Sequence, residues 1–174
     1  AAGEVNGIVE HHLEAQTVGG SLSATFYNLT INNTSGVSLG QHERVAHTLN
    51  LQSGVLALNT YNLTLAATTN VTGGPFDNST MIRADGTGKL CKEFSGTGAF
   101  LYPIGDGTGA PGYTPATLTF DSGTFGSSAQ ACVNLKNAKH PNNVSYNHLV
   151  RYWTISTSGI SNFSADVLFK YLDP

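Results

Sequence analysis

Residues 26–74 read FYNLTINNTSGVSLGQHERVAHTLNLQSGVLALNTYNLTLAATTNVTGG, and this stretch decides the fold class. Short runs in which apolar side chains alternate with polar ones recur along it, separated by Gly, Ser and Asn. Such alternation is typical of β-strands that have one buried face. The pentapeptides YNLTI at 27–31 and YNLTL at 61–65 are near copies. The stretch therefore predicts many short strands, arranged as the coils of a β-solenoid or as the hairpins of a sandwich.

The intervals between these runs leave both arrangements open. Leu29 and Leu49 are 20 residues apart, whereas Leu49 and Leu63 are 14 residues apart. A solenoid of regular coils predicts a constant interval, and short hairpins do not require one.

From Thr87 onward the predicted strands lengthen, and turns rich in Gly, Asn and Pro separate them. Longer strands with such turns indicate an antiparallel sandwich, for which a jelly-roll-like arrangement is one form. We therefore predict an all-β chain with an N-terminal strand or arm at 1–25 and one β domain at 26–174. The domain has a short-strand half at 26–86 and a sandwich half at 87–174. The longer strands are expected at 88–94, 98–104, 116–120, 129–136, 149–156 and 164–171.

The composition excludes several classes of protein. Gly, Thr, Asn and Ser together make 70 of the 174 residues, and only 11% of the residues are charged, which argues against a helical bundle or coiled coil. The net charge of −3 and the pI of about 6.0 argue against a nucleic-acid partner, which requires a basic face. No apolar run reaches the roughly 18 residues of a membrane span.

The termini and cysteines suggest an exported protein. The chain begins Ala-Ala-Gly, which resembles a mature terminus left by a signal peptidase, with a cloning boundary as the alternative. Cys91 and Cys132 predict one disulfide that closes a loop of about 40 residues, with two free buried thiols as the alternative. Among eight Asn-x-Ser/Thr triplets, Asn78 and Asn143 are the best candidates for glycosylation because both lie in loop-like sequence. The expected location is extracellular, secreted or at the cell surface.

A search for catalytic or metal-binding patterns finds none. The acidic residues are sparse and form no recognisable pair, and no G-x-S-x-G is present. His11 and His12, flanked by Glu10 and Glu14, would point to opposite faces of a strand, which favours a solvated polar terminus. The segment Gly105–Gly109 lacks the Lys-Ser/Thr of a phosphate loop and is expected to be a glycine turn, with calcium at Asp106 as a residual alternative. We predict no enzyme activity, no cofactor and no metal.

Two groups of side chains are candidates for binding. Val5, Val9 and Leu13 share one parity of a strand, and with Ile8 they could supply a strand to a neighbouring subunit, giving a homo-oligomer or fibre. Trp153, Tyr152 and Tyr113 could stack on a surface glycan, although a single Trp in a β-rich domain is more often part of the core. Arg151 is expected to pair with Asp106 or Asp166, or to cover an aromatic ring.

From Phe26 onward, the order and spacing of several segments go beyond shared composition. The chain resembles a module repeated in large secreted and cell-surface bacterial proteins of the type IX-exported kind, and the likeness covers about 145 residues. The stretch 40–48, with its QHER segment, departs from the family's pattern, and family members usually continue beyond the strand at 164–171. The segments that carry the likeness are FYNLTINN at 26–33, GV at 36–37, LNLQSGVL at 49–56, NLTL at 62–65, GTGKL at 86–90, FLYPIGD at 100–106, YTP at 113–115, HPNN at 140–143 and RYWT at 151–154.

The resemblance implies a β-rich spacer or adhesion unit and carries no catalytic residues. Together with the pattern of the N-terminal segment, it leads us to expect a non-enzymatic extracellular module, with a cell-surface filament assembled by strand exchange as its specific form. The alternative is a carbohydrate-binding, lectin-like module of a secreted adhesin.

Overall fold

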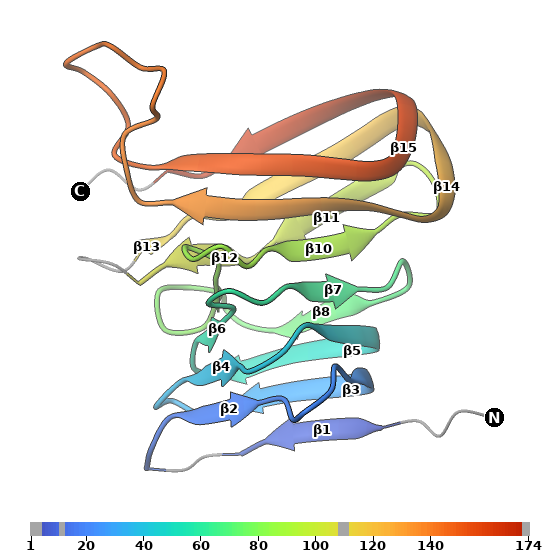
Figure 1. Cartoon of the computed structure of the whole chain (residues 1–174), viewed down its shortest axis with the longest axis vertical. Coiled ribbons are helices and arrows are strands. Elements are labelled where there is room, and N and C mark those ends of the chain that lie inside the picture. Colours follow the sequence, from blue (N-terminus) through green and yellow to red (C-terminus); the bar gives the residue numbers. More distant parts are fainter. Residues whose placement is uncertain (1–4, 11–12, 108–111, 172–174) are drawn as a thin grey trace.

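A computed structural model describes residues 5–10, 13–107 and 112–171, which form fifteen β-strands and no helix (Figure 1). The prediction of an all-β fold is confirmed. Among these residues there is accordingly no helix with the length and hydropathy of a membrane span.

The strands belong to two sheets. The larger sheet contains β1 (Asn6–Val9), β3 (Thr25–Asn32), β5 (Glu43–Ser53), β7 (Leu63–Leu65), β8 (Asn70–Gly73), β10 (Leu90–Glu93), β11 (Gly98–Tyr102), β14 (Ala116–Lys136) and β15 (Tyr152–Phe169). The smaller sheet contains β2 (Gln16–Val18), β4 (Val37–Leu39), β6 (Leu56–Ala57), β9 (Ile82–Arg83), β12 (Ile104–Asp106) and β13 (Gly112–Tyr113).

The chain winds through the two sheets as a solenoid. It passes from a strand of the larger sheet to a strand of the smaller one and back, and each strand lies parallel to its counterpart in the next coil. Figure 1 shows the coils stacked from β1 and β2 at one end to β14 and β15 at the other. The solenoid alternative therefore describes residues 26–86.

The irregular intervals in the sequence have a structural cause. Leu29 pairs with Leu49, as one 20-residue coil requires, but Leu63 pairs with Glu43. Leu49 pairs instead with Val71 of β8. β5 is long enough to pair with β7 along its first half and with β8 along its second half. Leu49 and Leu63 are therefore not equivalent positions in successive coils, and the 14 residues between them do not measure the length of a coil.

The core is a set of inward-facing apolar rows that run along the solenoid. One row joins Leu29 to Leu49, and the next joins Ile31 to Leu51, and all four side chains are fully buried. At about 25 cal/mol per Å² of apolar surface, such rows are the main stabilising contribution of the fold. The corner after β5 requires Gly54, whose φ is +88° and whose added Cβ would lie 1.8 Å from a backbone oxygen.

A long antiparallel hairpin covers one end of the solenoid. β14 lies antiparallel to β10 and β11, and β15 lies antiparallel to β14 along nearly its whole length. Cys91 and Cys132 face each other across β10 and β14 and form the predicted disulfide. Such a bond is typical of an oxidising environment. β10 and β12 each have one parallel and one antiparallel neighbour, so both kinds of pairing occur after residue 87.

Candidate functional site

The N-terminal segment forms the first coil of the solenoid over its described residues. β1 pairs in register with β3, and β2 pairs with β4, so the segment set apart as an arm belongs to both sheets. Val9 packs against the core, whereas Ile8 is 65% exposed and points away from it. Leu13, which is 93% exposed, lies beyond the end of β1. The segment therefore presents an outer strand edge with apolar side chains beside it.

The opposite end of the larger sheet carries a second apolar edge, which the sequence did not reveal as an edge. Phe163, Val167, Leu168 and Phe169 of β15 are all 40% exposed or more. The sequence does predict a strand at 164–171, but only the topology shows that β14 is the one described neighbour of this strand.

The three aromatic residues proposed for glycan binding have separate surroundings. The Trp153 ring is stacked on Phe169 with a centroid distance of 4.5 Å, and its Nε1 donates a hydrogen bond to the carbonyl oxygen of Thr114 at 3.1 Å. Tyr152 contacts the His140 ring edge-on at 4.9 Å. Tyr113 lines a pocket whose lining does not include the other two. The Trp153 ring thus serves mainly as packing, and Tyr113 remains the best placed for a ligand.

The pocket at Tyr113 has a volume of about 440 Å³ and combines apolar surface with a few charged groups. Asn78 Oδ1 accepts a hydrogen bond from the backbone N–H of Tyr113 at 2.7 Å, which joins the loop between β8 and β9 to β13. Burial raises the pKa of Tyr113. The lining residues are Phe76, Asp77, Asn78, Ser79, Tyr113, Pro115 and Lys170.

Two charged groups at this pocket were not predicted, Asp77 and Lys170. Asp77 Oδ1 accepts hydrogen bonds from the hydroxyl and the backbone N–H of Ser79, at 2.6 and 2.7 Å, and these hold the pKa of its carboxyl below the usual range. The backbone N–H of Lys170 donates to Pro115 at 3.0 Å. An aromatic surface with a carboxylate and an ammonium group nearby suits a ligand with apolar faces and hydroxyl groups. The sequence marked Asn78 and Tyr113 as candidates, but it gave no sign that Asp77 and Lys170 lie at the same pocket.

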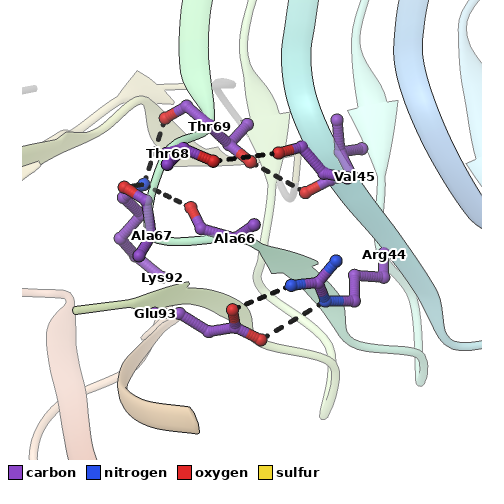
Figure 2. A network of polar contacts seen from close by, with 9 residues as sticks. Arg44, Val45, Ala66, Ala67, Thr68, Thr69, Lys92 and Glu93 are labelled. Carbon is purple, nitrogen blue, oxygen red and sulfur yellow. Dashed lines mark hydrogen bonds and ion pairs between the residues drawn. The ribbon is translucent and has the colours of Figure 1, made fainter. Parts of the chain in front are cut away.

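Lys92 is the centre of the polar network in Figure 2. Its side chain lies in an inward row after Val45 and Leu65 and is nearly buried. Its Nζ donates hydrogen bonds to the carbonyl oxygens of Ala66, Ala67 and Thr69 at 2.5, 2.8 and 3.0 Å. Burial lowers the pKa of this amine to about 8, and the nearby Glu93 carboxylate opposes the change. The amine clamps the turn that separates β7 from β8.

The surroundings of Lys92 tie three coils together. The Thr69 hydroxyl donates to the carbonyl oxygen of Val45 at 2.8 Å, and Arg44 pairs with Glu93 at 2.9 Å across the intervening β7 (Figure 2). All three hydrogen-bond partners of the amine are backbone carbonyl oxygens. The network therefore stabilises the turn, and it does not indicate catalysis.

The predicted ion pair of Arg151 is formed with Asp106. Arg151 Nη1 lies 3.1 Å from Asp106 Oδ2, and both side chains are buried. The neighbouring Gly112 allows this approach, because an added Cβ would lie 2.4 Å from Nη1. The Asp106 carboxylate thus faces a guanidinium group, which argues against calcium there. No cluster of three or more potential metal ligands occurs within 5–10, 13–107 and 112–171, and His11 and His12 lie outside these ranges.

The two glycosylation candidates lie in loops. Asn78 is exposed at the rim of the Tyr113 pocket, and Asn143 is half-buried in the loop between β14 and β15, where its Oδ1 accepts a hydrogen bond from Ser145 N–H at 2.8 Å.

Comparisons of the chain with protein-family models, curated proteins and solved structures find no match.

Proposed function

We propose that this protein is a non-enzymatic extracellular structural or adhesion module that assembles with copies of itself into a cell-surface filament through its N-terminal segment. The observation that carries the proposal is the position of β1, which is the outermost described strand of the larger sheet and has the exposed Ile8 on it. An outer strand with apolar side chains is a template for pairing with another chain. The disulfide and the low charge agree with an extracellular building block.

β1 pairs with β3 of its own chain, so it could contribute to assembly in two ways. In one, β1 leaves β3 of its own chain and pairs with β3 of a neighbour, which is strand exchange. In the other, β1 stays on β3 and offers its outer edge to a neighbour. Both forms require residues 5–13, and both predict loss of assembly when the segment is altered.

Electron microscopy and analytical ultracentrifugation of the intact protein test this proposal, with fibres or concentration-dependent oligomers as the expected result. Deletion of residues 1–14 should abolish them. Since the deletion also uncovers β3, Ile8→Lys is a gentler variant, because Ile8 is 65% exposed and a lysine on an edge strand discourages pairing. Leu22→Lys is the control, since Leu22 is an exposed apolar residue outside the strands. An intact chain that stays monomeric at high concentration would contradict the proposal.

A second candidate function is carbohydrate binding, and the pocket at Tyr113 favours it. Phe76 and Tyr113 offer aromatic surface, and Asp77 offers acceptors for sugar hydroxyl groups. A glycan array should show binding that is lost in Tyr113→Ala and retained in Tyr146→Ala, whose tyrosine is fully exposed on a loop. Binding that survives Tyr113→Ala, or no binding to any glycan, would exclude this pocket as a lectin site.

A further inference from the structure

Among the described residues, β15 pairs with β14 on one side and with no strand on the other. Lys170 donates its N–H to Pro115 of the strand's partner segment. Backbone groups along an antiparallel strand alternate between its two sides, so Leu168 and Asp166 also bond toward β14. The N–H groups of Val167 and Phe169 therefore point to the other side, where no described strand lies.

The side chains at this edge are the uncovered last row of the core. Val167 lies beside Leu118, and Phe169 lies beside Ala116, and both partners are buried. Val167 and Phe169 themselves are each 40% exposed. Terminal units of repeat proteins normally carry a polar outer surface that closes the core. No such surface follows β15 among the described residues, and within them half of an apolar row faces water.

The strand also lacks the residues that usually protect an edge. Tyr152–Phe169 contains no Lys, Arg or Pro, and its one charged residue is Asp166. Natural edge strands are short, charged or interrupted by proline, because a long apolar edge pairs with other chains. The pairing of β15 with β14 has register irregularities between Phe120 and Gln130, and the exposed Lys170 follows the strand. Residues 165–169, however, pair with 116–120 without a shift, so this part of the edge is suited to pairing.

The other end of the same sheet matches this edge in direction and in chemistry. β15 is antiparallel to β14, which is antiparallel to β10, and β10 is parallel through β7, β5 and β3 to β1. β1 and β15 therefore run in the same direction. The four residues of β1 carry no charge, and one of them, Ile8, is exposed. In a second copy moved along the solenoid axis, β1 would meet β15 in parallel, as successive coils do.

The two edges also lie on the same side of the coil. β1 continues the column of strands that contains the second half of β5 and β8. β8 and β11 line a common pocket, so β11 lies next to β8 in this column. β11 pairs with residues 116–120 of β14, and these pair in turn with residues 165–169 of β15. Figure 1 shows β1 and β15 at opposite ends of this stack.

We infer that a second copy of this chain covers the β15 edge with its β1 edge, so that the larger sheet continues from copy to copy. The inference rests on the proposed self-assembly and names the surface that receives the N-terminal segment. β1 remains paired with β3 of its own chain. The two surfaces in the contact are different, and successive copies are related by a movement along the solenoid axis. The contact therefore generates an open filament and not a closed dimer.

Disulfide trapping between two variants, each with one cysteine added to the native Cys91–Cys132 pair, tests the contact. Ile8 and Leu168 both point outward from the sheet at the two edges, and paired strands lie about 4.8 Å apart, within reach of a disulfide. Under mild oxidation, a mixture of Ile8→Cys and Leu168→Cys should give a heterodimer, whereas neither variant alone should dimerise. Leu101→Cys is the matched control, because Leu101 lies in the same cross-strand row as Leu168, two strands from the edge. Its mixture with Ile8→Cys should give no dimer.

Assembly of a second pair of variants gives an independent readout. Val167→Lys places a charge on the uncovered row and should raise the concentration needed for assembly about tenfold or more. Leu101→Lys adds the same charge on the sheet surface and should assemble as the intact chain does. The circular dichroism spectra of both variants should match that of the intact chain, which checks that they fold.

The outcomes separate this inference from the proposed function. Fibres that form without an Ile8–Leu168 link, or that tolerate Val167→Lys, would leave self-assembly intact and overturn the stacking contact. Dimers of Leu168→Cys alone would show that the β15 edge pairs with itself, and would also overturn it. If the intact chain never assembles, both the proposed function and the inference are wrong.

Discussion

Replacing Lys92 with methionine tests how the solenoid tolerates a charge in an inward row. The lysine follows Val45 and Leu65 in that row, and its side chain is 6% exposed. Methionine has a similar unbranched shape and fills irregular apolar space, so the substitution removes mainly the charge and the three hydrogen bonds to the turn.

The expected effect depends on pH. The pKa of Lys92 falls from 10.5 to about 8 because burial disfavours the charged amine. Below pH 8 the amine is charged in both folded and unfolded states, and the folded state bears the full cost. Between pH 8 and 10.5 the folded state has lost the proton that the unfolded state still holds, so stability rises with pH. At 1.36 kcal/mol per pKa unit, the cost is about 3 kcal/mol near pH 7 and falls below about 1 kcal/mol at pH 10.

The measurement is the free energy of unfolding in urea at pH 7 and pH 10. The stability of the intact protein relative to Lys92→Met should increase by about 2 to 3 kcal/mol over this interval. Lys89→Met is the control, because Lys89 Nζ donates to the Ser156 hydroxyl at 3.2 Å and is only half-buried. A difference that is flat or that falls as pH rises would refute the reasoning, because it would mean that the three carbonyl oxygens hold the amine charged despite its burial.

Three further perturbations follow from the structure. Replacing Cys91 and Cys132 together by serine should lower stability by about 4 kcal/mol, from the entropy of a 41-residue closure, and the loss should appear as a lower urea midpoint that reductant does not change. Arg151→Met leaves the Asp106 carboxylate buried without its guanidinium partner and should cost about 3–5 kcal/mol, whereas the double variant with Asp106→Asn should recover part of it in thermal melts. Gly54→Ala should lower the melting temperature by several degrees or more, and an unchanged value would show that the corner can open.

The strands and the disulfide could be predicted from the sequence because both rest on local or countable features. Alternation marks the strand at 27–31, and two cysteines allow one pairing. The sequence could not decide between a solenoid and a sandwich of hairpins. The unequal intervals arise because β5 pairs with β7 along one half and with β8 along the other, which only the structure shows. The inward position of Lys92 was hidden for a related reason, since alternation assigns a lysine to the outer face of a strand.

The candidate sites were less accessible to sequence reasoning. Tyr113 was identified, but its pocket depends on a hydrogen bond to Asn78, 35 residues away along the chain. The strand at 164–171 was predicted, yet nothing in its residues shows which of its sides has a neighbour. Edges and pockets are properties of the topology, and periodicity describes only one strand at a time.

The disulfide also determines how the molecule would respond to mechanical tension. Cys91 lies on the last parallel strand of its column, and Cys132 lies on the hairpin that covers it. When the chain is pulled from its two ends, the segment between the cysteines cannot extend while the bond is intact. With a separation of 41 residues, this withholds about 140 Å of length. The junction between coils and hairpin would therefore act as an inextensible link, and unravelling under load would be confined to the coils before it and to the final strand.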